Sequence, residues 1–130
     1  MTIPKLDKIL MVEDDLDIQT VAEMALAAVG GHTVHLCSSG QQALDDVAGF
    51  APDLILLDVM MPGMDGPTTY HALRSRPETA TTPVIFMTAK VQPAELASYK
   101  TLGAIGVIQK PFDPMTLSSD VAALWNEHHG

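Results

Sequence analysis

Carboxylic acids follow two apolar segments of the sequence that read as buried strands. Glu13 and Asp14 come directly after "KILMV" (residues 8–12), and Asp58 ends "DLILLD" (residues 53–58). An unpaired buried charge destabilises a fold by several kcal/mol, so these acids are expected at strand ends where other polar groups meet them. Neighbouring carboxylates about 4 Å apart repel by roughly 4 kcal/mol at an effective dielectric constant near 20. A hard divalent cation with oxygen ligands, such as Mg²⁺, would relieve this repulsion.

Two further strand-like segments end on a hydroxyl and an ammonium group. Thr88 ends "PVIFMT" (residues 83–88), and Lys110 with Pro111 follows "AIGVIQ" (residues 104–109). Carboxylates, a divalent cation, a hydroxyl and an ammonium group together can handle a phosphoryl group. Each has a simpler explanation alone, because acids are favoured at helix starts and a lone threonine is usually a cap. Asp15 in particular is expected to be a helix cap or a surface acid. Four such groups at four strand ends are difficult to attribute to chance.

The elements that must position these groups alternate along the chain. A further strand-like segment, "HTVHLC" (residues 32–37), brings the number of expected strands to five. Alternating strands and helices predict an α/β fold with a doubly wound, five-stranded parallel sheet flanked by five helices. In the common strand order 2-1-3-4-5, ligands bind at the carboxyl edge between the first and third strands. The helices are expected from an apolar stripe over Ile18–Ala28 closed by Gly30 and Gly31, from a second stripe over Ala43–Ala48, after Gly66 with Pro67 in the first turn, over Pro93–Leu102, and from Asp113 and Pro114 onward.

Composition bounds the class of protein. The 130 residues fit a single domain spanning positions 1–130, and 16 acidic against 7 basic residues give a formal charge of −9. This charge argues against direct nucleic-acid binding, which needs a basic surface. No apolar run approaches the roughly 20 residues of a membrane span, and the N-terminus lacks a signal-peptide core. We therefore expect no membrane insertion and a cytoplasmic location.

The single cysteine and the five histidines give no motif of their own. Cys37 is expected to be a buried strand thiol. No histidine lies near the predicted site or at ligand spacing from acids, so we expect no metal or phosphodonor role for any of them. Because the sequence lacks a Cys/His cluster, zinc and copper are not expected.

Taken together, four motifs identify a family resemblance. The motifs "ILMVEDD", "DLILLDVMMPGMDG", "PVIFMTA" and "QKPF" occur in this order, each at an expected strand end. Over essentially its whole length the chain resembles the receiver domain of two-component response regulators, and it is similar to the single-domain, chemotaxis-regulator type. The resemblance implies a flavodoxin-like fold and a phosphorylation-controlled signalling switch that is not a classical enzyme.

The resemblance also implies roles for individual residues. Asp58 would accept a phosphoryl group from a phosphohistidine on a sensor histidine kinase or phosphotransfer protein, and Thr88 and Lys110 would contact its oxygens. Glu13, Asp14, Asp58 and the backbone carbonyl of Met60 would bind Mg²⁺, for which Mn²⁺ is an acceptable substitute. The Lys110–Pro111 peptide would be cis. A change of conformation would then alter binding of a downstream protein target, through a face that includes Lys100 and Val107.

Three positions bear on how such a switch works. The family's usual switch aromatic, three residues before the lysine, is replaced by Val107, so we expect a muted or differently routed change on the output face. Met60 and Lys90 lie where the family tunes the lifetime of the acyl phosphate. Met60, Met61 and Met64 are expected to form a soft patch beside Asp58, suited to kinase docking.

Alternative functions remain open at this point. The chain ends just after the last expected helix, which favours a receiver acting alone, but a segment of a hybrid kinase or multidomain regulator fits the same residues. An aspartate-nucleophile phosphatase is disfavoured, because Met60 stands where that chemistry needs a second aspartate. A flavin-binding domain is disfavoured too, because "EDDLD" after the first strand repels phosphate.

Overall fold

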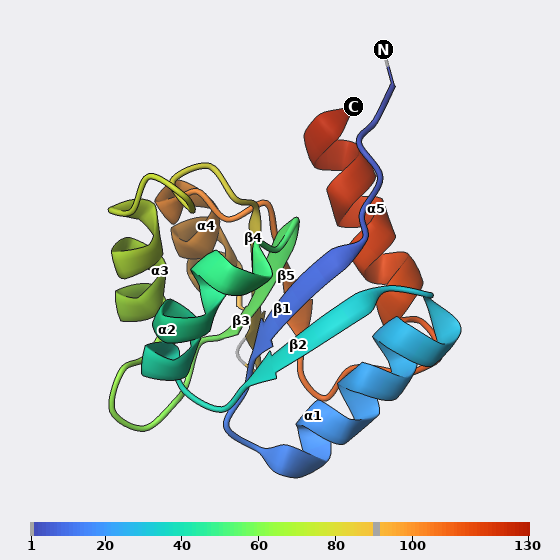
Figure 1. The fold of residues 1–130 in the computed structure, drawn as a ribbon, viewed down its shortest axis with the longest axis horizontal. Coiled ribbons are helices and arrows are strands. Elements are labelled where there is room, and N and C mark those ends of the chain that lie inside the picture. Colours follow the sequence, from blue (N-terminus) through green and yellow to red (C-terminus); the bar gives the residue numbers. More distant parts are fainter. Residues whose placement is uncertain (1, 90–91) are drawn as a thin grey trace.

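The sheet holds the five expected strands in the expected order. The structure is a computed structural model that describes residues 2–89 and 92–130. All strands are parallel in the order β2-β1-β3-β4-β5, which confirms the predicted doubly wound sheet (Figure 1). β3 and β4 are buried at every position, as central parallel strands should be. The strands are β1 (Lys8–Val12), β2 (Thr33–Cys37), β3 (Leu54–Asp58), β4 (Val84–Thr88) and β5 (Gly106–Gln109).

Helices cover both faces of the sheet (Figure 1). One face packs against α2, α3 and α4, and the other packs against α1, its continuation η1 and α5. Each face therefore has its own apolar core, and the carboxyl ends of the strands are left at one uncovered edge. The helices are α1 (Leu16–Glu23), η1 (Met24–Val29), α2 (Gly40–Phe50), α3 (Gly66–Arg74), α4 (Pro93–Leu102) and α5 (Leu117–His129).

Two predicted helix boundaries differ from the structure. The stripe expected as one helix continues past Glu23 as a π-helix, in which the N–H of Gly30 donates to the carbonyl of Ala25 (3.1 Å). The last helix begins at Leu117 and not at Asp113. The Asp113 carboxylate instead accepts the N–H of Met115 (2.8 Å), so it caps a turn that precedes the helix.

The predicted burial of Cys37 is confirmed, and Trp125 is also a core residue. Cys37 is fully buried, and Trp125 packs into the α1–α5 side, where its indole N–H donates to the carbonyl of Pro4 (2.8 Å). Within the described part of the chain, no helix has the length and apolar character needed to cross a bilayer.

Candidate functional site

Main-chain hydrogen bonds beyond the strands fix the polar residues at the carboxyl edge. The N–H of Glu13 donates to the carbonyl of Cys37, and that of Lys110 donates to the carbonyl of Thr88, both at 2.9 Å. These bonds continue the ladders past the last strand residues. The sheet therefore fixes the backbone of Glu13 and Lys110, from which their side chains extend.

Three carboxylates meet at this edge. Glu13, Asp14 and Asp58 each offer an oxygen within 4.8 Å of the others. Glu13 and Asp58 are 1% exposed, whereas Asp14 is exposed at the rim. The structure thus brings together the acids that the sequence predicted would meet, although they come from segments more than forty residues apart.

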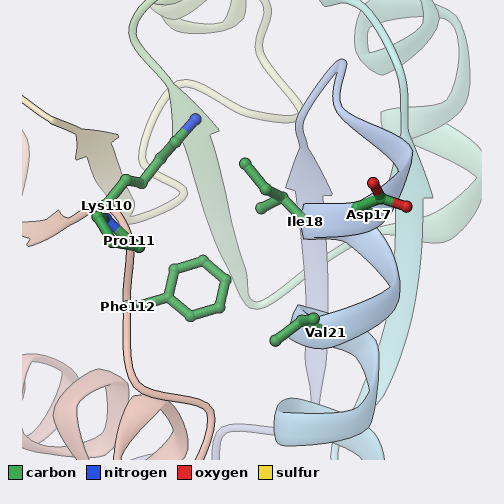
Figure 2. Close-up of a pocket in the computed structure, with 6 residues that line it drawn as sticks. All are labelled: Asp17, Ile18, Val21, Lys110, Pro111 and Phe112. Carbon is green, nitrogen blue, oxygen red and sulfur yellow. The ribbon is translucent and has the colours of Figure 1, made fainter.

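Lys110, which follows the edge strand β5, reaches the two buried acids across the carboxyl ends of the strands. Its Nζ lies 2.7 Å from Glu13 Oε1 and 3.1 Å from Asp58 Oδ1. The peptide bond between Lys110 and Pro111 is cis, as the resemblance implied. Figure 2 shows the lysine side chain directed away from the Phe112 ring, which faces α1.

Burial and charge shift two pKa values at the site. Burial is the main cause that raises the pKa of Glu13, aided by the Asp58 charge and opposed by hydrogen bonds from Lys110 and from the N–H of Asp15. Burial alone would lower the pKa of Lys110, but its hydrogen bonds and charge interactions with Glu13 and Asp58 raise it overall. The ammonium group therefore stays charged. The charged form of Glu13 is less stable here than it would be in water.

The donor set suits a divalent cation. Three carboxylates and one ammonium group leave two unit negative charges at the edge. Asp58 Oδ2 is buried and has no hydrogen-bond partner among the described residues, which is expensive for a carboxylate oxygen. Oxygen ligands with this charge fit Mg²⁺ better than a soft metal.

Thr88 lies next to this cluster in the strand register. Asp58 pairs with Met87 on β4, and Thr88 is the following residue, 2% exposed. Its position at the end of β4 places it on the same edge as Asp58 and Lys110. All the side chains predicted from strand ends are thus at one edge.

The loop after β3 is shaped by a close backbone approach. The N–H of Gly66 donates to the carbonyl of Val59 (2.9 Å), and a Cβ at Gly66 would clash with the main chain of Asp58 and Val59. Asp65 then caps α3 by accepting the N–H of Thr68 (2.9 Å). Only a glycine allows α3 to start so near Asp58.

The expected methionine patch is largely wrong. Met60 is 67% exposed, but Met61 is 8% exposed and Met64 packs on the α2–α3 side of the core. The two inward methionines fill the space under the loop, so one exposed methionine stands beside Asp58. The expected lifetime role of Lys90 falls on a residue outside the described ranges.

The sequence analysis did not identify Gln19, which supports the loop that carries Glu13. Gln19 lies on the buried face of α1, 7% exposed, and its amide donates to the carbonyl of Glu13 and to Ser38 Oγ (3.0 Å). It ties the acid-bearing loop to the loop after β2. A polar residue inside the apolar stripe of α1 was the available signal.

Asp15 is the N-cap of α1, and its side chain accepts the N–H groups of Asp17 and Ile18. A helix cap was one of the two roles expected for this residue.

The prediction that no histidine lies at ligand distance from an acid is wrong for His35. His35 Nε2 lies 2.9 Å from Asp46 Oδ2, and Cys37 Sγ is close to the same oxygen. The sequence separation of 11 residues between His35 and Asp46 hid this contact, because one residue lies on β2 and the other on α2.

The aromatic side chains beside Val107 come from elements other than β5. Val107 pairs with Phe86 in the β4–β5 register. The Phe86 ring lies 5.2 Å from the Tyr99 ring on α4 and 5.6 Å from the Tyr70 ring on α3. Tyr99 is 9% exposed, so an aromatic from α4 fills the region beside Val107. Lys100 and Val107 line one hollow between α4, β5 and α5.

Comparisons with known proteins agree on one family. Residues 9–122 match the model of the response regulator receiver domain. The transcriptional regulatory protein CpxR of Escherichia coli is 36% identical over 124 residues, 95% of this chain and 51% of CpxR. The uncharacterised transcriptional regulatory protein YclJ of Bacillus subtilis is 36% identical over 90% of this chain and 50% of its own. The chain thus spans about half the length of these curated relatives.

Solved structures show the same fold. The chemotaxis response regulator CheY4 of Vibrio cholerae has a TM-score of 0.84 at 29% identity, over 92% of this chain and 99% of that chain. A response regulator from Chloroflexus aurantiacus has a TM-score of 0.82 at 30% identity, over 94% and 99%.

Proposed function

The chain belongs to the response regulator receiver family of two-component signalling, and we propose that it is a phosphorylation-controlled switch with Asp58 as phosphoacceptor. The observation that carries the proposal is the geometry of one buried carboxylate. Asp58 is 1% exposed at the end of β3, with one oxygen paired to Lys110 and the other without a partner among the described residues. An acid so placed is oriented by Lys110 and keeps one oxygen that a cation or a phosphoryl group can engage.

Each neighbouring group has a role in the proposed transfer. The phosphorus of a phosphohistidine is attacked by the Asp58 carboxylate, the P–N bond breaks, and an acyl phosphate forms. Lys110 neutralises charge on a phosphoryl oxygen, and the Thr88 hydroxyl donates to another. Catalysis is then mainly positioning and charge neutralisation. Water later cleaves the acyl phosphate and resets the domain.

We propose Glu13, Asp14, Asp58 and the main-chain carbonyl of Met60 as ligands of Mg²⁺, with Mn²⁺ as a substitute. When bound, the ion offsets negative charge on the phosphoryl oxygens. The two unpaired negative charges at the edge and the orphan oxygen of Asp58 support this ligand set.

A protein partner has to reach Asp58, and the surface beside Lys110 offers room. An apolar hollow of about 260 Å³ lies between α1 and the segment after β5 (Figure 2). We propose that a sensor histidine kinase or phosphotransfer protein contacts this side, and that a downstream protein binds the face with Lys100 and Val107. The hollow is lined by Asp17, Ile18, Val21, Lys110, Pro111 and Phe112.

The wider setting follows from the family. We propose that residues 1–130 form one receiver domain, which the family match over residues 9–122 and the single sheet support, and that it acts in the cytoplasm. A receiver acting alone and a receiver within a larger regulator or hybrid kinase use the same site. The phosphatase alternative stays disfavoured, because the side chain two positions after Asp58 is the exposed Met60.

A phosphorylation assay tests the proposal. The chain is incubated with acetyl phosphate and Mg²⁺, and its intact mass is measured. We expect one added phosphoryl group, absent in Asp58→Asn and after chelation of the metal. Asp45→Asn, which removes an exposed acid on α2, is the matched control and should be phosphorylated normally. Phosphorylation that persists in Asp58→Asn, or rapid turnover of acetyl phosphate without a labelled protein, would contradict the proposal.

A further inference from the structure

Three metal-ligating side chains meet on the β2–α2 side of the sheet. His35 and Cys37 are two residues apart on β2 and therefore point to the same face, while Asp46 comes from α2. His35 Nε2 lies 2.9 Å and Cys37 Sγ lies 3.9 Å from Asp46 Oδ2, and all three ligand atoms are within 4.8 Å of one another. None of these residues belongs to the Glu13–Asp14–Asp58 cluster.

We propose that His35, Cys37 and Asp46 form a second metal site that binds Zn²⁺. Thiolate, imidazole and carboxylate are the ligands that zinc uses, and three of them leave an open position for water or a fourth ligand. Zinc–ligand bonds of about 2.0–2.3 Å in a tetrahedron place ligand atoms roughly 3.3–3.7 Å apart. Asp46 Oδ2 lies 2.9 Å from His35 Nε2 and 3.9 Å from Cys37 Sγ, one distance below this range and one above it. A modest adjustment of the side chains would therefore complete the site.

The surroundings are organised around one oxygen. Asp46 Oδ2 is approached by His35 Nε2, by Cys37 Sγ and by Gln42 Nε2 at 3.4 Å. The ring of Phe50 stacks on the His35 imidazole, with centroids 5.2 Å apart and planes at 30°, which fixes the orientation of the ring. The cation would replace the protons that now face this oxygen, and Gln42 would remain as a supporting contact.

The site is open to solvent on one side and buried on the other. His35 and Asp46 line a shallow hollow of about 460 Å³, together with the exposed Asp45, whose charge favours an approaching cation. Cys37 is fully buried, and its Sγ lies 3.9 Å from Asp46 Oδ2. Metal binding would release the proton of the Cys37 thiol to solvent.

Cobalt spectroscopy tests the site directly. Co²⁺ takes the ligands of Zn²⁺, and a thiolate bound to Co²⁺ absorbs in the near ultraviolet. Cys37 is the one cysteine of the sequence, so this band can arise only there. Titration is carried out in excess Mg²⁺, which occupies the acidic cluster. We expect a thiolate–cobalt band that saturates at one ion per chain and disappears when Zn²⁺ is added.

Variants distinguish ligands from bystanders. Cys37→Ser should abolish the band, and His35→Gln and Asp46→Asn should each weaken Co²⁺ binding at least tenfold, comparable with the loss of a supporting contact. His71→Gln, which changes an exposed histidine on α3, is the matched control and should bind as the wild type does. His35 and Asp46 are partly exposed, so their variants remain informative if Cys37→Ser fails to fold. Absence of a thiolate band in excess Co²⁺, or an undiminished band in both His35→Gln and Asp46→Asn, would overturn the proposal.

Discussion

Lys110 Nζ lies 2.7 Å from Glu13 Oε1, although the two residues are 97 positions apart in the chain. The contact crosses from the end of β5 to the end of β1, and the same Nζ lies 3.1 Å from Oδ1 of Asp58 on β3, one of the two strands between them. One ammonium group thus holds two buried carboxylates from different strands. We expect the stability of the site to depend on this arrangement.

Removing that ammonium group should destabilise the fold. Lys110→Met leaves two buried carboxylates without their cation, and breaking a buried pair in this way costs about 3 kcal/mol, the lower end of the usual range because the lysine side chain is 17% exposed. Urea unfolding measures the change. The exposed Lys100→Met is the control and should stay within about 0.5 kcal/mol of the wild type. Equal stability of Lys110→Met and wild type would show that the pair is energetically unimportant.

Glu13 should make stability depend on pH in a defined direction. Its pKa is raised in the folded state, so the folded state binds the proton more tightly, and Glu13 favours folding at pH values below its ordinary pKa of 4.5. That contribution is lost as the pH rises through the folded-state pKa. Without Mg²⁺, Glu13→Gln should therefore be at least as stable as the wild type at pH 7, with a difference that shrinks toward pH 4.5.

Added Mg²⁺ should change the difference in stability between the wild type and Glu13→Gln. A ligand that binds only the folded state adds about 2.7 kcal/mol at a concentration of 100 times its dissociation constant. The wild type should gain this stabilisation, and Glu13→Gln should gain less. Thermal unfolding with and without Mg²⁺ reports both effects, with Glu127→Gln, an exposed glutamate on α5, as the control. An equal gain in the wild type and Glu13→Gln would exclude Glu13 as a ligand.

Cys37 should resist alkylation in the folded protein. The thiolate is the reactive form, and a pKa of about 12 in a fully buried side chain leaves very little of it at pH 8. Intact mass after iodoacetamide treatment should show an unmodified native chain and a singly modified chain in urea. Rapid labelling of the native protein would mean that β2 opens readily or that the thiol is not buried.

Val107 should limit the change on the output face. Tyr99 on α4 already packs against Phe86 beside this position, so no aromatic on β5 needs to swing inward. Comparing nuclear magnetic resonance spectra of the free chain and of the chain with beryllofluoride and Mg²⁺, we expect shifts around Asp58 and Thr88 and small shifts over residues 104–108. A large rearrangement over 104–108 would contradict this expectation.

Strand ends could be predicted from the sequence because apolar runs stop there on residues that cannot be buried unpaired. Glu13, Asp58 and Lys110 follow this rule, and parallel pairing then places them at one edge. The helix over Pro93–Leu102 was predicted with its exact bounds because Pro93 and Gly103 mark both ends. The start of α5 was wrong because an aspartate followed by a proline caps a turn as well as a helix.

Contacts between elements were harder to predict than the elements. The pairing of His35 with Asp46 and the bond from Gln19 to Glu13 depend on how helices are turned against the sheet, which spacing does not specify. The inward packing of Met61 and the contact of Tyr99 with Phe86 have the same origin. Each arises from space left by neighbouring side chains and not from local pattern.

The position of the phosphoryl group tests the central claim most directly. An acyl phosphate on an aspartate is reduced by borohydride to homoserine, which marks the acceptor permanently. After treatment with acetyl phosphate and Mg²⁺ and then borohydride, peptide mass spectrometry should find homoserine at position 58 and unchanged aspartate at position 14. Homoserine at another acidic position, with Asp58 intact, would contradict the account.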